Sequence, residues 1–138
     1  MPDDITTAKD GDLATPALME AISAAFNSRD VDRIASFFTE DATFCLARGP
    51  EPVGRTLKGR ETIRKALADR FKVIPDMRWE HKEHIFLGNR AVSVWTVKGR
   101  SADGELLNYQ GCDIYTIRGG KIFAKDTYWK IVEHRDRL

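Results

Sequence analysis

The chain has 138 residues, of which 42% are hydrophobic and 31% charged, and this composition suits one globular domain with its own core. Its formal net charge of +1 comes from well-mixed signs without a basic tract, which argues against a nucleic-acid-binding protein. No apolar run approaches the roughly 20 residues that a membrane span needs, so no membrane partner is expected.

Residues 1–14 are polar and have almost nothing to bury, so they predict a disordered lead and no signal peptide. A single domain is expected over residues 15–138. The two cysteines, Cys45 and Cys112, are too few for a disulfide framework or a metal site. Both lie in apolar, strand-like runs, which favours buried free thiols and a cytoplasmic protein.

Three helices are predicted in the first half of the chain. Thr15 followed by Pro16 is typical of a helix start, and an apolar stripe follows. Asp30 predicts the cap of a second, short helix. A third helix is predicted from about residue 59 to 73, and Pro75 prevents it from continuing. The apolar residues expected in the core are Phe38, Phe44, Ile63, Leu67 and Phe71.

Strands are predicted for most of the remaining chain. Residues 41–46 form one, and residues 48–58 contain two glycines and two prolines, which indicates a loop with one short strand. A long antiparallel meander is then predicted from strands at residues 77–87, 91–100, 105–117 and 121–132. Helices first and a meander afterwards define an α+β fold, with the helices packed on one face of the sheet.

The last two strands carry the most informative feature of the sequence. Gly119-Gly120 predicts a tight hairpin turn that pairs Arg118 with Lys121. If the pairing continues without interruption, Asp113 lies opposite Asp126 on the same face. Two adjacent carboxylates disfavour joint ionisation, so one of them is expected to keep its proton, as some acid–base catalysts do. A bulge at the turn would instead slip the register and reverse the face of Asp126.

Four segments, at residues 24–32, 37–44, 59–64 and 111–122, follow one another in an order that resembles the NTF2-like superfamily. Within it, the chain resembles the SnoaL-like and ketosteroid isomerase-like branch from about residue 16 to 130. The resemblance implies a cone-shaped, cystatin-like α+β fold with a deep, largely apolar pocket for a small molecule. It implies no single activity, because this scaffold hosts isomerases, cyclases, dehydratases, epoxide hydrolases and binding domains.

The resemblance also implies roles for particular residues. Ketosteroid isomerases use a protonated aspartic acid as a donor to the substrate oxyanion, and Asp113 lies at the matching position. Their general base and their tyrosine would fall at Leu46 and about Ile22, which are apolar here. Limonene epoxide hydrolases use an arginine and two aspartates, and of these only the carboxylate on the last strand has a counterpart here, near Asp126. The best match is to SnoaL-like polyketide cyclases, in which an acidic pocket residue assists an aldol ring closure.

Each aspartate also has a plainer interpretation. Asp113 lies between Cys112 and Ile114 and faces away from both. On the cavity face it is a desolvated acid, whereas on the other face it is an exposed aspartate paired with Lys98 or Lys125. Asp126 lies between Lys125 and Thr127, a context that by itself is typical of a surface residue.

His84 is a further candidate base. A turn at Gly88-Asn89 pairs His84 with Ser93 and sets it on the face of Phe86 and Trp95. Resemblance to the isomerases implies that Trp95 and Val97 line the cavity. A structural histidine and a plain core tryptophan are the alternatives.

The turn at Asp103-Gly104 affects which face Asp113 occupies. A two-residue turn there would set Asp113 on the face opposite to Trp95, whereas a longer loop or a bulge would bring the two together. Tyr115 and Tyr128 are expected on the face of Asp113, as packing groups or as hydroxyl donors. His81 and His134 are expected to be exposed.

An apolar row is expected on the sheet face that the helices leave open: Cys112, Ile114, Thr116, Phe123 and Trp129. Such a row favours an interface. We therefore expect a homodimer through the outer sheet face, as the resemblance also implies.

These observations favour an enzyme without cofactor or metal, of the cyclase, isomerase or dehydratase type, acting on a carbonyl or polyketide-like substrate. Asp113 would be the acid or oxyanion donor, and Asp126 or His84 the base. The substrate pocket would be lined by Phe86, Trp95, Val97, Tyr115 and Tyr128. The alternative is a non-catalytic domain that holds an apolar ligand or a partner peptide.

Overall fold

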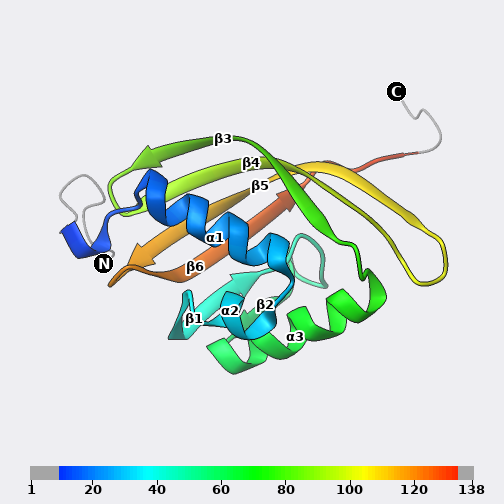
Figure 1. Cartoon of the computed structure of the whole chain (residues 1–138), viewed down its shortest axis with the longest axis horizontal. Helices are drawn as coiled ribbons and strands as arrows, with labels where there is room; N and C mark the ends of the chain where they lie inside the picture. Colours follow the sequence, from blue (N-terminus) through cyan, green and yellow to red (C-terminus); the bar gives the residue numbers. More distant parts are fainter. Residues whose placement is uncertain (1–9, 134–138) are drawn as a thin grey trace.

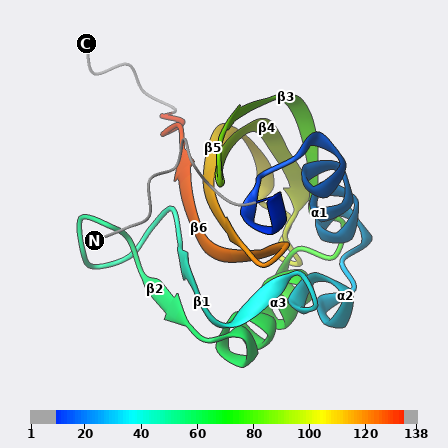
Figure 2. The same ribbon diagram turned by 90° about the vertical axis from the view of Figure 1, so that its left-hand side faces the viewer.

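The computed structural model describes residues 10–133, which form three α-helices packed on the concave face of one curved sheet (Figures 1 and 2). The helices are α1 (Pro16–Ser28), α2 (Val31–Ala35) and α3 (Arg60–Val73). The strands are β1 (Phe38–Cys45), β2 (Thr56–Lys58), β3 (Arg78–Leu87), β4 (Arg90–Arg100), β5 (Leu106–Arg118) and β6 (Lys121–Trp129). The predicted α+β, cystatin-like fold is confirmed.

Helix starts follow the predicted caps. The Thr15 hydroxyl accepts the Leu18 N–H at 3.2 Å, and α1 begins at Pro16. Asp30 caps α2 by accepting two backbone N–H groups, at 3.1 and 3.2 Å. Arg29, between the two helices, adopts a left-handed conformation with φ 58°, which turns the chain sharply from α1 into α2.

The described part of the chain begins within the lead that was expected to be disordered. Residues 1–9 lie outside the described residues, whereas Asp10–Asp12 form a short 3-10 helix, η2. The Asp12 carboxylate accepts the N–H of Gly119 at 2.6 Å, and the Ala14 N–H donates to the carbonyl of Gly88 at 2.9 Å. The segment is therefore tied to two hairpin turns of the sheet.

The sheet has the strand order β2-β1-β6-β5-β4-β3. Strands β3 to β6 form the predicted antiparallel meander, and β1 adds to it in parallel beside β6. In Figure 2 the sheet curls around the helices, so that residues on its inner face converge. Within residues 10–133, no helix is long and apolar enough to cross a membrane.

A β-bulge at Phe123 determines which side chains of β6 face inward. Beside the turn, Ile117 pairs with Ile122 as expected, but the next pair is Thr116 with Ala124, so Phe123 has no partner in β5. The extra residue turns every later side chain of β6 to the other face. The predicted pairing of Asp113 with Asp126 is therefore wrong.

Beyond the bulge, Asp113 pairs with Thr127, and Asp126 pairs with Ile114 on the outer face. Trp129, expected on the outer face, instead points inward and lines a cavity, while Tyr128 lies on the outer face and is 54% exposed. Both corrections follow from the one residue that the bulge adds.

The pairing of β4 with β5 and with β3 resolves two other questions of register. Arg100 pairs with Leu106, so a five-residue loop brings Asp113 onto the face of Trp95. His84 pairs with Ser93 as predicted, but a second irregularity follows between His81 and Glu83. It sets His81 on the inner face opposite Trp95. His81 is half-buried, so its expected exposure is wrong.

The core lies between the helices and the inner face of the sheet. Phe38 and Ile63 are fully buried, and Phe44 and Leu67 are at most 7% exposed, as predicted. Phe71 is only half-buried and packs edge-on against Trp79, with ring centroids 6.3 Å apart. The helical faces that the apolar periodicity predicted are thus the ones that meet the sheet.

Candidate functional site

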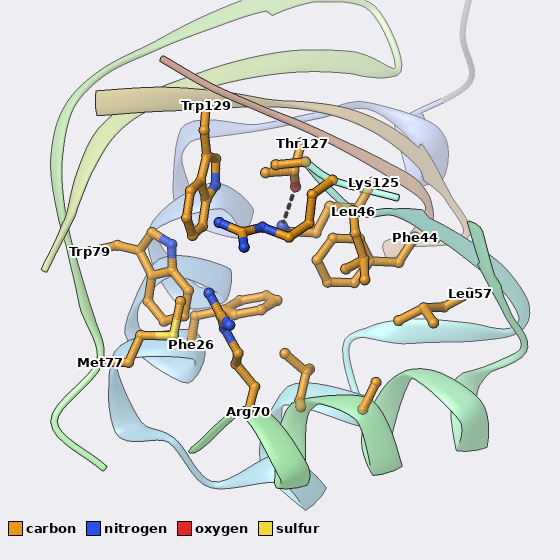
Figure 3. A pocket seen from close by; sticks show the side chains of 14 residues that line it. Phe26, Phe44, Leu46, Leu57, Arg70, Met77, Trp79, Lys125, Thr127 and Trp129 are labelled. Carbon is orange, nitrogen blue, oxygen red and sulfur yellow. Dashed lines mark hydrogen bonds between the residues drawn. The ribbon is translucent and has the colours of Figure 1, made fainter. Parts of the chain in front are cut away.

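A cavity of about 160 Å³ lies between α1, α3 and the inner face of the sheet (Figure 3). Its walls are mostly apolar and include Phe26, Phe44, Leu57, Trp79 and Trp129. Four polar or charged side chains also line it: Arg48, Arg70, Lys125 and Thr127. Few polar groups in an apolar hollow are typical of small-molecule sites.

Beneath this cavity, four donors converge on the carboxylate of Asp113, which is 3% exposed. Lys125 Nζ and Thr127 Oγ1 donate to Oδ1 at 2.9 and 2.5 Å. Trp95 Nε1 donates to Oδ2 at 2.8 Å, and the Tyr115 hydroxyl donates to the same atom at 3.4 Å. A carboxylate offers about four lone-pair positions, so this network occupies all of them.

The bulge of β6 builds this network. Lys125 pairs with Tyr115 and Thr127 pairs with Asp113, so all four residues share the inner face. The Lys125 ammonium also lies 4.0 Å from the centroid of the Phe44 ring, a distance at which a cation is attracted to the face of an aromatic ring. The ammonium is thus held both by a carboxylate and by the cavity wall.

Burial sets the electrostatics of this network. It lowers the pKa of Lys125, although the nearby Asp113 carboxylate acts in the opposite direction. Burial, and then the charge of Asp113, raise the pKa of Tyr115 well above its usual range. Tyr115 therefore keeps its hydroxyl proton at neutral pH and donates a hydrogen bond. The ammonium of Lys125 gives up a proton more readily than that of a lysine in water.

A second, smaller cavity of about 10 Å³ lies beside the first and is lined by Ser23, His81, Asp113 and Lys125, among others. His81 Nε2 lies 3.3 Å from the Ser23 hydroxyl. Burial, and then the proximity of His84, lower the pKa of His81, which favours a neutral imidazole near pH 7. Lys125 lines both cavities and connects them.

His84 lies on the inner face but does not line the main cavity. Its ring centroid is 5.5 Å from that of His81, and burial lowers its pKa. Within residues 10–133, His84 Nδ1 and the hydroxyl of its neighbour Ser93 are buried without a hydrogen-bond partner.

The other residues expected at the site do not line the main cavity. Asp126 accepts the Tyr128 hydroxyl at 3.0 Å on the outer face, away from the cavity. Trp95 and Val97 are completely buried, and Phe86 packs against the core, so these three do not line the main cavity. Asp113 and Tyr115 do reach the smaller cavity.

Sequence reasoning missed Lys125, Thr127, Trp129, His81 and the two arginines as site residues. Lys125 follows the apolar run Ile122-Phe123-Ala124, and its place inside the barrel-like curve of the sheet depends on the bulge. Alternation from Lys125 through Thr127 to Trp129 gives one continuous face, so recognising the bulge would have found all three.

The family of SnoaL-like domains matches residues 19–125, and the chain belongs to this family. Its structure is similar to an uncharacterised cystatin-fold protein from Novosphingobium aromaticivorans, with 27% identity, TM-score 0.69, and 80% of this chain and 94% of that chain covered. It is similar to TerC co-crystallised with polyporic acid, with 26% identity, TM-score 0.69, and coverage of 83% and 89%.

A third similar structure is a protein with a ketosteroid isomerase-like fold from Catenulispora acidiphila, in complex with trimethylamine. Identity is 18%, the TM-score is 0.74, and 86% of this chain and 88% of that chain are covered, which shows the fold alone. No protein of curated function matches the sequence.

Proposed function

We propose that the chain binds a small, apolar carbonyl compound in the main cavity and transforms it by acid–base chemistry without a cofactor. The observation that carries this proposal is Lys125, whose ammonium is anchored by Asp113 at the base of an apolar cavity. Polar groups that converge on such a cavity are typical of active sites. The co-crystal of the similar protein TerC with polyporic acid supports a small-molecule role for this chain.

In the proposed mechanism, Lys125 donates to the carbonyl oxygen of the ligand and stabilises the enolate that forms when an adjacent carbon loses a proton. Asp113 acts through Lys125, because its own acceptor positions are occupied by four donors. It is therefore a positioning residue that keeps the ammonium charged and oriented.

His81 is the proposed acceptor of the carbon-bound proton. Its lowered pKa keeps the imidazole neutral near pH 7, and it lines the small cavity next to Lys125. His84 contacts His81 but lines neither the main nor the small cavity, so we assign it a supporting role. Return of the proton from His81 to a different carbon completes an isomerisation. In a cyclisation, the enolate carbon instead attacks a second carbonyl, and the alkoxide that forms takes the proton from His81.

The test measures hydrogen–deuterium exchange at the α-carbon of 1-phenylpropan-2-one, a neutral one-ring ketone, by proton NMR in deuterated buffer. Wild type is expected to accelerate the exchange. Lys125→Met combined with Asp113→Asn removes both charges of the buried pair, so the cavity should bind the ketone without accelerating exchange. Lys121→Met, at the exposed start of β6 beside the hairpin turn, is the matched control and should behave as wild type.

One result would contradict the proposal. If wild type binds the ketone but exchange proceeds at the rate of the buffer, the cavity holds ligands without transforming them. The occupied acceptor positions of Asp113 are consistent with that second function, a non-catalytic binding domain.

A further inference from the structure

Two arginines from separate elements converge on one wall of the main cavity. Arg48 lies in the connection between β1 and β2, and Arg70 lies in the last turn of α3. Their guanidinium carbons are 5.9 and 5.8 Å from the centroid of the Trp129 ring. Figure 3 shows Arg70 reaching from α3 into the cavity toward Trp129. Trp129 is itself stacked on Tyr109, with centroids 5.4 Å apart, so both guanidinium groups rest on a fixed aromatic surface.

The loop that carries Arg48 is held by its own backbone. Its flanks are joined by hydrogen bonds from the Leu46 N–H to the Arg55 carbonyl at 2.8 Å and from the Arg55 N–H to the Arg48 carbonyl at 3.0 Å. Gly54 closes the loop with φ 78°, and a Cβ there would lie 2.0 Å from the Leu46 carbonyl oxygen. Only glycine fits this position, so the backbone of Arg48 is fixed before any ligand arrives.

Neither Arg48 nor Arg70 forms an ion pair with a carboxylate of the described residues. Burial, and then the positive charge of Arg48, lower the pKa of Arg70, while Glu105 acts weakly in the opposite direction. Arg70 is half-buried and Arg48 is exposed, and two like charges held beside one ring are unfavourable unless an anion joins them.

The rest of the cavity does not supply that anion. The described residues that line it include no aspartate or glutamate. Lys125, the third cation, is already matched by Asp113 behind the cavity wall. Glu105 lines a neighbouring hollow with both arginines and acts on Arg70 from there, so within the main cavity itself the positive charge of the arginines remains for a ligand to neutralise.

We infer that this cavity is built for an organic anion, whose carboxylate or enolate oxygens lie between Arg48 and Arg70 while its apolar body fills the cavity. The inference rests on the proposed small-molecule function and deepens it by naming the substrate class. The planar guanidinium fork matches the two oxygens of a carboxylate. A volume of about 160 Å³ resembles that of cavities of about 150 Å³ that accept benzene, which suggests a body of about one aromatic ring.

The test compares the binding of 3-phenylpropanoate and its neutral amide, 3-phenylpropanamide, by isothermal titration calorimetry. These probes differ in charge and have nearly the same size and shape. Wild type is expected to bind the carboxylate about 10-fold or more tightly than the amide, because charge-assisted hydrogen bonds exceed neutral ones. Raising the salt concentration should reduce this ratio.

Arg48→Gln and Arg70→Gln should each reduce the preference for the carboxylate while leaving the affinity for the amide nearly unchanged. Arg64→Gln is the matched control, because Arg64 is on α3 but already pairs with Glu61 at 2.6 Å. Arg48 lies on an exposed loop, so its variant should fold even if that of Arg70 does not.

Equal binding of the two probes to wild type would overturn the inference but leave the proposed ketone chemistry intact. A preference that survives both arginine substitutions would also overturn it. Failure of both probes to bind, together with failure of the neutral ketone, would overturn the inference and the proposed function at once.

Discussion

Lys125 Nζ lies 2.9 Å from Asp113 Oδ1, and the two side chains are only 5% and 4% exposed. These residues belong to neighbouring strands but are not directly paired, since Asp113 pairs with Thr127 and Lys125 pairs with Tyr115. The long lysine side chain therefore reaches diagonally across the sheet to the carboxylate. Both charges leave water on folding, and each is tolerated because the other is present.

The first prediction concerns the stability of this ion pair. Lys125→Met should reduce the free energy of unfolding by about 3–5 kcal/mol, because it leaves a buried carboxylate without its counter-charge. Adding Asp113→Asn should recover most of that loss. Urea denaturation of the two single variants and the double variant measures the coupling. A Lys125→Met variant as stable as wild type would show that the pair is open to water.

The second prediction concerns pH. The pKa values of His81 and His84 are lowered by burial, so near pH 6 the unfolded chain binds more protons than the folded one. The free energy of unfolding should therefore fall as pH decreases from 7.5 through the unperturbed histidine value of about 6.5, and continue to fall until the folded-state histidines are protonated. Chemical denaturation at several pH values measures this slope. The double substitution His81→Gln, His84→Gln should flatten it, and an unchanged slope would contradict the assignment.

The third prediction separates two aromatic positions in the core. Phe38 is completely buried, so Phe38→Ala should cost about 3–5 kcal/mol of stability. Phe71→Ala should cost less, because Phe71 is half-buried beside Trp79. Equilibrium denaturation compares the two. Equal losses would mean that Phe71 is as enclosed as Phe38 in solution.

The fourth prediction is a homodimer through the outer face of the sheet. Ile85 and Leu87 of β3 are 53% and 52% exposed. Ile85 pairs with Val92, which in turn pairs with Ile114, so the three side chains form an apolar row across the outer face. A partly exposed apolar row of this kind favours a two-fold interface. Sedimentation at micromolar concentration should therefore show a dimer.

Ile85→Glu should dissociate that dimer, because it places a charge in the apolar row. Val53→Glu is the control, since Val53 is 63% exposed but lies in the connection between β1 and β2. A wild-type monomer would remove the prediction.

Local sequence signals predicted most of the fold. The caps at Thr15 and Asp30 begin helices as expected, and Gly119 and Gly120 both adopt the positive φ angles that their turn requires. These features depend on a few adjacent residues. The parallel pairing of β1 with β6 depends on residues about 80 positions apart and has no such local signal.

The candidate site was predicted less well, because it depends on register. The sequence left the face of Asp113 open; it lies on the inner face, and its partner there is Lys125 rather than Asp126. A bulge changes the face of every residue beyond it without altering the apolar pattern of the run that contains it. Arg48 and Arg70 lie on a loop and a helix, and only the folded chain brings both to Trp129.

The single unpaired residue at Phe123 has a consequence for how this site can change during evolution. Loss of that one residue would remove the bulge but leave Ala124 opposite Thr116, Lys125 opposite Tyr115 and Thr127 opposite Asp113, so the same side chains would still face inward. A one-residue slip that keeps Phe123 in the ladder opposite Thr116 would instead bring Asp126 opposite Asp113 and put an acidic residue where Thr127 now lies. Aligning a chain that has this bulge with a chain of equal length that lacks it, without a gap, would therefore compare inward residues of one protein with outward residues of the other.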